Sequence, residues 1–205
     1  MTSSDVRSRR PQADKFEDRR RELADAALVT LADLGYARTS LRTIAENTSF
    51  SHGVLHYYFR DKVELITYCV QRYKVACVAR YDGLVAAADT AEGLATACGE
   101  GLATTLREDA LLHRLWYDLR AQALFEPAFR ADVAAIDDSL QGMIWRVVSS
   151  YGELGGRTPT ASPSYAYALF DGLFGQALLR HLDGSPVAVD DLRDGARDLL
   201  PRLFV

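Results

Sequence analysis

Apolar residues recur at the spacing of an α-helix along almost the whole chain, and no stretch shows the sustained alternation of a β-strand. In residues 16–34 the apolar positions are separated by steps of four, four and three: Leu23, Ala27, Leu31 and Leu34. Gly35 follows directly, and glycine adopts at little cost the left-handed conformation that ends many helices. The pattern predicts an all-α protein that begins with an amphipathic helix.

Two very short helices are predicted next. Thr39 and Ser40 carry hydroxyl groups suited to cap a helix over residues 41–47, and Ser51 can cap another that ends at Tyr57. Helices of about two turns are unstable alone, because nucleating a helix is costly. These two must therefore pack on each other and on the first helix, as a compact three-helix unit.

A long helix is predicted from about residue 62. Asp61 and Glu64 have the spacing of a capping box in its carboxylate form, and apolar residues follow at helical spacing. Beyond residue 88 the breaks in the pattern predict five more helices, at about residues 90–107, 109–124, 127–153, 163–183 and 189–203. We therefore expect about nine helices.

The predicted helices and their breaks divide the chain into three parts. These are a disordered basic arm at residues 1–13, a three-helix helix-turn-helix domain at 14–61, and a larger helical domain at 62–205. Residues 1–62 hold 11 Lys and Arg against 9 Asp and Glu, whereas residues 63–205 hold 13 against 19. The cationic front part is the one suited to approach a polyanion.

Composition favours a globular protein of a reducing cytoplasm. Of the 205 residues, 48% are hydrophobic and 25% charged, as in ordinary soluble domains. The three cysteines form an odd set without CxxC spacing, which argues against a disulfide framework or a structural zinc site. The first twenty residues lack the apolar run of a signal peptide, and no window approaches the roughly 18 apolar residues of a membrane span. We expect a soluble, cytoplasmic protein.

The segment SFSHGVLHYYFRDK at residues 49–62 places His52 and His56 four residues apart, on one face of a helix. One hypothesis is a metal site in a helical metalloenzyme. A zinc protease of the HExxH type needs Glu after the first histidine, whereas this chain has Gly53 there. The other two histidines, His113 and His181, have no nearby Cys or carboxylate pattern.

The alternative is that this short helix is the second helix of a helix-turn-helix motif. Such a helix packs its apolar side inward and places its polar side in the major groove of DNA. Val54 and Leu55 suit the inner side, and the polar outer side holds Ser51, His52, Gly53 and His56. The two histidines are then expected to face DNA rather than a metal ion.

Residues 20–66 resemble the DNA-binding region of the tetracycline-repressor (TetR) type of bacterial transcriptional regulators. The resemblance rests on an ordered run of motifs: GY at 35–36, TSLRTIA at 39–45, SHGVLHYYF at 51–59 and DKVEL at 61–65. The HYYF ending is similar to a subset that includes betaine- and pyrimidine-responsive repressors. The resemblance implies a sequence-specific DNA-binding regulator, a repressor released from a palindromic operator by a small-molecule effector.

The resemblance also implies roles for single residues. Those expected to contact the DNA backbone are Thr39, Ser40, Thr43, Tyr57 and Lys62, and those expected in the groove are Ser51, His52, Gly53 and His56. Arg42 suits either a phosphate contact or an ordinary surface position, and the arm arginines suit either DNA or a disordered tail. The family usually has glycine in the turn where this chain has Ser49, so we expect a left-handed Asn47 or a strained serine there.

The rear domain is expected to hold a dimer interface and a ligand pocket. Residues 164–179 are apolar around almost the whole helix, so both sides must be covered. The resemblance implies a homodimer through the helices at 163–183 and 189–203. The candidate pocket residues, which alternatively belong to the core, are His113, Trp116, Trp145, Phe170 and Gln176.

No catalytic motif is found in the sequence. It contains no Ser-His-Asp arrangement, P-loop or glycine-rich dinucleotide turn, so we expect neither an enzyme nor a cofactor. Two alternatives to the ligand-responsive regulator stay open at this point: a helical metalloenzyme that uses His52 and His56, and a ligand-independent DNA-binding protein.

Overall fold

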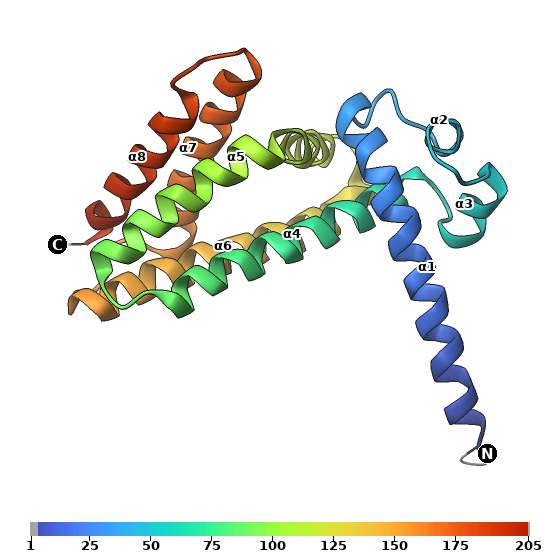
Figure 1. Ribbon diagram of the computed structural model, residues 1–205, viewed down its shortest axis with the longest axis horizontal. Coiled ribbons are helices and arrows are strands. Elements are labelled where there is room, and N and C mark those ends of the chain that lie inside the picture. The colour runs from blue at the N-terminus through green and yellow to red at the C-terminus, as the bar shows by residue number, and fades with distance from the viewer. Residues whose placement is uncertain (1–3, 205) are drawn as a thin grey trace. The chain divides into compact units, whose positions relative to one another are not determined.

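The computed structural model describes the backbone of residues 4–204 and the side chains of residues 14–204. The described part is all-α, as predicted (Figure 1). It contains eight α-helices and two short 3-10 helices: α1 (Ser4–Leu34), α2 (Leu41–Glu46), α3 (His52–Tyr58), α4 (Lys62–Ala87), α5 (Ala91–Gln122), η1 (Pro127–Phe129), α6 (Arg130–Gly155), α7 (Pro163–Leu182), α8 (Ala188–Leu199) and η2 (Leu200–Leu203).

The expected number of nine helices is corrected to eight within the described residues. The two helices predicted at 90–107 and 109–124 are one helix, α5, with a kink at Asp109. The kinked residue has φ −117° and ψ 18°, outside the helical region. The break in the apolar pattern was therefore real, but the helix bends there instead of ending.

The chain divides into two compact units, Met1–Val70 and Gln71–Val205. The division falls within α4, whereas the expected boundary lay at the start of that helix. The first turns of α4 belong with the front unit because Leu65, Ile66 and Cys69 are buried there. The Cys69 thiol donates a hydrogen bond to the backbone oxygen of Ala24, on α1, at 3.4 Å.

Helix α1 begins at Ser4, so its backbone includes most of the arm that we expected to be irregular. Adding residues to a helix that is already nucleated costs little, because each one gains a hydrogen bond. The first three residues and the side chains up to residue 13 lie outside the described part. A role for Arg7, Arg9 and Arg10 therefore stays a prediction.

The rear unit is built around close packing of α5 with α6, α7 and α8. Gly99 marks the place where α5 and α8 approach most tightly, since a Cβ atom there would lie 2.5 Å from the backbone oxygen of Arg193. Trp116 and Phe129 are among the largest fully buried side chains of this core. None of the described helices is both long and apolar enough to cross a membrane.

Replacing Gly99 by Ala is expected to lower the free energy of unfolding by about 1–3 kcal/mol, because an overpacked site must shift its backbone. The matched control is Gly83→Ala on α4, where a Cβ would meet nothing within 4 Å. That change is expected to stabilise the protein by up to about 1 kcal/mol, through helix propensity. Urea unfolding followed by circular dichroism measures both, and equal effects would contradict the packing argument.

Candidate nucleic-acid interface and internal cavity

Helix α2 is fixed at both ends by its own side chains. The Ser40 hydroxyl accepts a hydrogen bond from the backbone N–H of Thr43 at 3.0 Å, and the two hydroxyl oxygens lie 2.8 Å apart. At the other end, Nδ2 of Asn47 donates to the backbone oxygen of Thr43 at 2.8 Å. The predicted cap at Ser40 is thus present, and both hydroxyl groups stay at the surface of the front unit.

The turn between α2 and α3 differs from the expectation. Asn47 has φ −105°, and no residue other than glycine has a positive φ in the described chain. A left-handed Asn47 or a strained Ser49 was therefore wrong. The turn closes instead through hydrogen bonds, from the Asn47 side chain and from the N–H of Phe50 to the Thr48 hydroxyl at 3.4 Å.

Helix α3 has one buried side and one exposed side. Its N-terminus is capped by Ser51, whose hydroxyl accepts from the N–H of Val54 at 3.3 Å. Leu55 is fully buried, and Phe59 directly after the helix is nearly so. The residues on the exposed side are Ser51, His52, Gly53, His56 and Tyr57. The predicted orientation of α3 agrees with the structure, and contact of this side with DNA stays a prediction.

The two histidines of α3 pack against each other. Their rings lie edge to face, with centroids 4.4 Å apart. Within the described part of the chain, no group of three or more His, Cys, Asp or Glu residues is placed to hold a metal ion. Two exposed imidazoles without a third ligand do not make a structural or catalytic zinc site.

Tyr57 belongs to an aromatic cluster that the sequence analysis missed. Its side chain is 73% exposed, and its ring contacts the ring of Tyr58, with centroids 4.9 Å apart. Phe16 of α1 packs on Tyr58 at 4.7 Å and on the edge of Tyr57 at 6.1 Å. A lone aromatic near the start of an amphipathic helix was the only signal for Phe16 in the sequence.

Thr39 and Lys62 are placed differently from the other predicted DNA contacts. Thr39 is only 3% exposed, and its hydroxyl donates to the backbone oxygen of Gly35 at 2.7 Å. Nζ of Lys62 donates to the backbone oxygen of Tyr36 at 3.3 Å and lies 3.9 Å from the centre of the Tyr36 ring. Both side chains stabilise the turn after α1 in this way, and their contact with the DNA backbone stays a prediction.

Arg42 keeps its place as a surface candidate. Its side chain is 81% exposed on α2 and forms an ion pair with Glu46, one turn further on, at 3.0 Å. An exposed pair of this kind is worth little. The guanidinium is therefore available to exchange its carboxylate partner for a phosphate.

Glu64 joins α4 to the rest of the front unit. Its backbone N–H donates to the Asp61 carboxylate at 2.9 Å, which is one half of the predicted capping box. Its own carboxylate accepts from Arg20 of α1 at 2.9 Å, and from the backbone and side chain of Arg60 at 3.0 Å. Although burial opposes it, these hydrogen bonds and the charge of Arg20 lower the pKa of Glu64.

Replacing Glu64 by Gln is expected to lower the free energy of unfolding by about 1–3 kcal/mol at neutral pH, because Arg20 and Arg60 lose a charged acceptor. Since the pKa is lowered by folding, this stabilisation is present above the unfolded value of about 4.3 and is lost as the pH falls through the folded value. Glu46→Gln, which breaks the exposed pair with Arg42, is the control. Chemical unfolding at pH 7 and pH 3 should show a gap between the variants only at pH 7.

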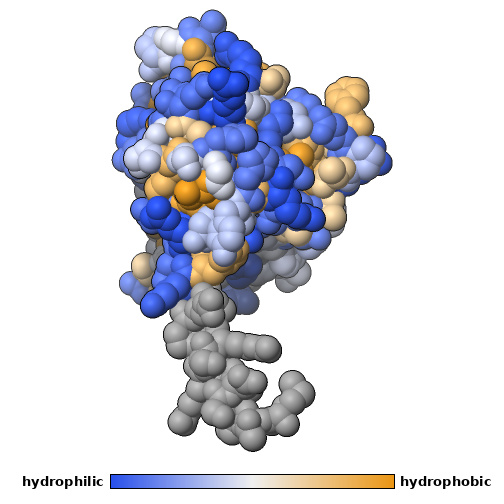
Figure 2. Space-filling model, turned by 90° about the vertical axis from the view of Figure 1, so that its right-hand side faces the viewer, coloured by the Kyte–Doolittle hydropathy of each residue, from blue (hydrophilic) through white to orange (hydrophobic). Residues whose placement is uncertain are grey.

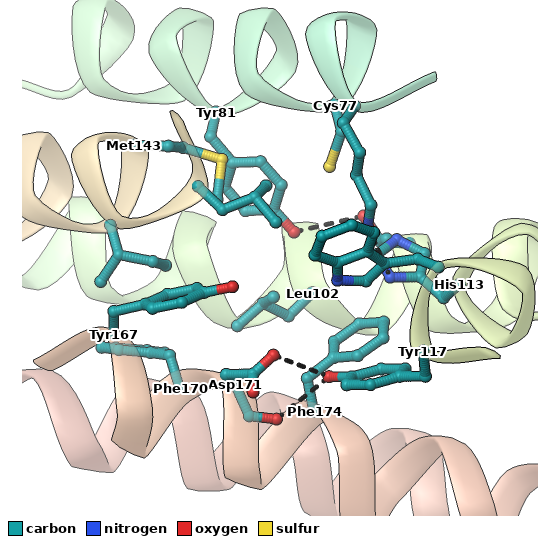
Figure 3. A pocket seen from close by; sticks show the side chains of 15 residues that line it. Cys77, Tyr81, Leu102, His113, Tyr117, Met143, Tyr167, Phe170, Asp171 and Phe174 are labelled. Carbon is teal, nitrogen blue, oxygen red and sulfur yellow. Dashed lines mark hydrogen bonds between the residues drawn. The ribbon is translucent and has the colours of Figure 1, made fainter. Parts of the chain in front are cut away.

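The rear unit contains a partly open cavity of about 60 Å³ lined by residues of α4, α5, α6 and α7 (Figure 3). Most of its lining is apolar, from Leu102, Leu140, Met143, Ile144, Phe170 and Phe174. Ligand pockets usually have several hundred Å³, whereas this volume holds only a few water molecules. A larger ligand must therefore widen the cavity.

Three of the five predicted pocket residues line this cavity, and two do not. His113, Trp116 and Phe170 are in its wall. Trp145 lines a separate surface hollow, because its neighbours Met143 and Ile144 take the inward side of α6. Gln176 is exposed on the outer side of α7. The predictions that Trp145 and Gln176 line this cavity were therefore wrong. Successive residues of a helix point about 100° apart, so residues next to each other in the sequence lie on different sides of the helix.

Lys74 is the cavity residue that the sequence analysis missed. It is 3% exposed, and its Nζ lies 3.2 Å from Nδ1 of His113. Burial lowers the pKa of Lys74 to about 8, and burial followed by the charge of Lys74 lowers the pKa of His113 well below its ordinary value. The signal was in the sequence: Lys74 lies between Val70 and Cys77 on the apolar side of α4.

The acidic groups of the cavity are already paired. Arg120 donates to Asp171 at 2.7 Å and to Asp137 at 3.2 Å. Tyr117 donates to Asp171 at 3.0 Å, as drawn in Figure 3, and Tyr167 donates to Asp137. Burial raises the pKa of both tyrosines, so they remain protonated donors.

Helices α7 and α8 form an open hollow of about 540 Å³ on the outside of the rear unit, lined by Ala168, Leu169, Gly172, Leu173, Gln176, Gly195, Asp198, Leu199 and Arg202. Leu179, further along α7, is 71% exposed. On the face shown in Figure 2, hydrophobic residues form small patches among hydrophilic ones.

Comparisons with known proteins relate the front unit to bacterial transcriptional regulators. Residues 23–69 match a family model described as bacterial regulatory proteins, tetR family. The HTH-type transcriptional regulator BetI of Cronobacter sakazakii is 30% identical over 113 residues, which are 53% of this chain and 55% of that protein. The chain thus spans about half the length of this curated relative.

Solved structures extend the likeness of fold to nearly the whole chain. A TetR transcription regulator from Haloarcula marismortui has a TM-score of 0.75 at 19% identity, covering 92% of this chain and 100% of that one. A transcriptional regulator from Saccharomonospora viridis in complex with choline has a TM-score of 0.73 at 18% identity, covering 92% and 98%. The arrangement of a helix-turn-helix unit followed by a helical unit is therefore that of these regulators.

Proposed function

We propose that the chain is a sequence-specific DNA-binding transcriptional regulator, a repressor whose hold on DNA is released by a small molecule, because residues 23–69 match the model of the tetR family of bacterial regulatory proteins. The observation that carries the proposal is helix α3. It is a short, capped helix with Leu55 buried beneath it and an exposed polar side. A helix of this form fits the major groove.

The proposed interface uses the exposed residues of the front unit. His52, Gly53 and His56 face the bases, and Gly53 has open space around its α-carbon, so that a duplex can approach the backbone closely. The proposed phosphate contacts come from Ser40, Arg42, Thr43, Ser51 and Tyr57. Each phosphate neutralised by a cation steepens the dependence of log affinity on log salt by about 0.9.

A homodimer is the second part of the proposal. A few contacts from one α3 give useful affinity only when they are doubled on a palindromic operator, with the two recognition helices about 34–36 Å apart. The proposed dimer surface is the outer side of α7 and α8, where Gly172 and Leu179 are exposed. An apolar helix side of this kind is stabilised when a second copy covers it.

The third part is the effector. We place it in the cavity of the rear unit, where it must widen the space to enter. Effector binding releases DNA only to the extent that the ligand prefers the conformation that does not fit the operator. The choline complex of the Saccharomonospora regulator shows a small molecule bound by a protein of this fold, and supports a search for one here.

The proposal is tested by measuring binding to the DNA upstream of the protein's own coding region and to random DNA of equal length, over a range of salt concentrations. A specific regulator binds the upstream DNA at least about a thousandfold more tightly. Equal binding to both DNAs would favour the alternative of a ligand-independent, nonspecific DNA-binding protein. Stoichiometric zinc in the purified protein, lost in a His52→Ala variant, would instead revive the metalloenzyme alternative.

A further inference from the structure

Lys74 carries a charge that the cavity does not balance. Among the described residues it forms no ion pair, and its hydrogen-bond partner is the neutral ring of His113, at 3.2 Å. The rings of Trp116 and Tyr73 lie 5.4 Å and 5.3 Å from its Nζ and offer only the weaker attraction of their π faces. A buried ammonium group ordinarily has an acidic partner, because burial without one is costly.

His113 supplies a second unused hydrogen-bond donor. When Lys74 is charged its nitrogen can only donate, so Nδ1 of His113 accepts and Nε2 carries the ring proton. Nε2 is buried and has no hydrogen-bond partner. The His113 ring is held by Phe174 at 4.5 Å and by the edge of Tyr73 at 5.5 Å. Because Nε2 lies on the side of the ring opposite to Nδ1, this second donor points away from Nζ, and Lys74 is the charged donor to which the cavity offers no acidic partner.

The acids nearby do not neutralise Lys74. Asp171 is engaged by Arg120 and Tyr117, and Asp109 accepts from Arg80 at 3.2 Å. The titratable and charged groups that act on Lys74 and His113 from α4, α5 and α7 are Tyr73, Cys77, Arg80, Asp109, Arg120 and Asp171. Asp109 is paired with Arg80, and Asp171 and Asp137 share Arg120, so none of these carboxylates pairs directly with Lys74.

We propose that the cavity binds a monocarboxylate with an apolar body, whose carboxylate oxygens accept hydrogen bonds from Nζ of Lys74, which His113 holds in place through Nδ1. The carboxylate supplies the direct acidic partner that Lys74 lacks. The apolar body lies along Leu102, Met143, Ile144 and Phe174, which widen the cavity as it enters. A cationic ligand is disfavoured, because Lys74 repels it and Arg120 already occupies the carboxylates.

This inference names the chemical class of the effector, and so rests on the cavity being the effector site of the proposed function. Binding to the protein without DNA tests it separately. Carboxylate binding that leaves operator affinity unchanged would sustain the inference and refute the effector role. If the protein binds its operator specifically but its cavity binds no carboxylate, the inference is refuted and the proposed function is kept.

The test uses the fluorescence of Trp116, next to Lys74, in a Trp145→Phe background that removes the chain's other tryptophan. The ligands are butanoate, octanoate, dodecanoate and benzoate, each compared with its alcohol, and octylammonium as a cation. At least one carboxylate is expected to bind at least about tenfold more tightly than its alcohol. Octylammonium is expected to bind more weakly than octanoate.

Lys74→Met is expected to lower carboxylate affinity by about ten- to a hundredfold and to leave alcohol affinity nearly unchanged, because it removes the charged donor and keeps the shape. Lys15→Met, at an exposed position of the front unit, is the control and changes neither. In the parent protein the affinity also falls as the pH rises above about 8, where Lys74 loses its proton. This pH dependence is absent from Lys74→Met.

His113→Phe gives a second, independent variant, which removes the acceptor that holds Nζ of Lys74 in place and keeps an aromatic ring. It is expected to lower carboxylate affinity by up to about tenfold, with little effect on the alcohol. The inference is overturned if no carboxylate binds better than its alcohol, if octylammonium binds better than octanoate, or if Lys74→Met binds carboxylates as the parent does.

Discussion

A Gly172→Glu variant is expected to be monomeric and to bind the operator at least about a hundredfold more weakly. The substitution places a charge in the middle of the outer side of α7, where the proposed partner subunit packs. Two α3 helices joined in one dimer bind with an effective concentration that raises overall affinity by about 10²–10⁴. A monomer loses that gain even though its own α3 is unchanged.

The fold of each subunit should survive this substitution. A Cβ atom at Gly172 would meet nothing within 4 Å, and Glu is a better helix former than Gly. Gly175, three residues further on, is not suitable, because a Cβ there would lie 3.3 Å from the Tyr117 hydroxyl. Gly83→Glu, at an equally open helical position on α4, is the control and should stay dimeric.

Light scattering after size-exclusion chromatography measures the mass of these variants, and fluorescence anisotropy with labelled upstream DNA measures their affinity. Circular dichroism checks that both remain helical. A Gly172→Glu protein that is still dimeric and binds DNA as the parent does would show that the interface lies elsewhere.

Lys74→Met is expected to change how stability depends on pH, by about 3 kcal/mol between neutral and alkaline pH. Folding lowers the pKa of Lys74 from an ordinary 10.5 to about 8, and each unit corresponds to about 1.4 kcal/mol. Below about pH 8 the lysine is charged in both states, so the folded protein bears the whole cost of the buried charge.

Between about pH 8 and 10.5 the unfolded chain binds a proton that the folded protein does not, so the stability of the parent rises with pH. Lys74→Met has no such rise. Near neutral pH the variant is expected to be more stable than the parent by about 1–2 kcal/mol, because Met fills the site without a charge and only the contact with His113 is lost.

Urea unfolding of both proteins at several pH values gives the difference between their free energies of unfolding directly. The contributions of the other titrating groups cancel in this difference. The advantage of the variant should vanish by about pH 9.5 and give way to an advantage of the parent at higher pH, whereas Lys15→Met should track the parent throughout. A difference between Lys74→Met and parent that is constant with pH would mean that Lys74 has an ordinary pKa.

Much of the fold was predictable because helical periodicity is local. The caps at Ser40 and Ser51 and the boundaries near residues 62 and 163 follow from short-range chemistry that a sequence displays directly. The kink at Asp109 was visible only as a break, because a bent helix and two separate helices interrupt the apolar pattern in the same way. Packing decides between them.

The sites were predictable only in part. The inner and outer sides of α3 follow from helical geometry, but the positions of Thr39 and Lys62 depend on the backbone of the turn after α1, to whose carbonyl groups they donate hydrogen bonds. In the rear unit, the sequence indicates which residues are aromatic but not which helix side faces the cavity. Trp145 and Gln176 were misplaced for that reason.

The central claim is that the exposed side of α3 reads DNA bases, and the most direct measurement is binding-site selection from random DNA by the parent and by His52→Ala. The account predicts two half-sites about 10 base pairs apart. It also predicts that His52→Ala changes the preferred base at one position of each half-site while overall affinity for other DNA stays nearly the same. Equal weakening on every sequence, with the preference unchanged, would contradict the claim.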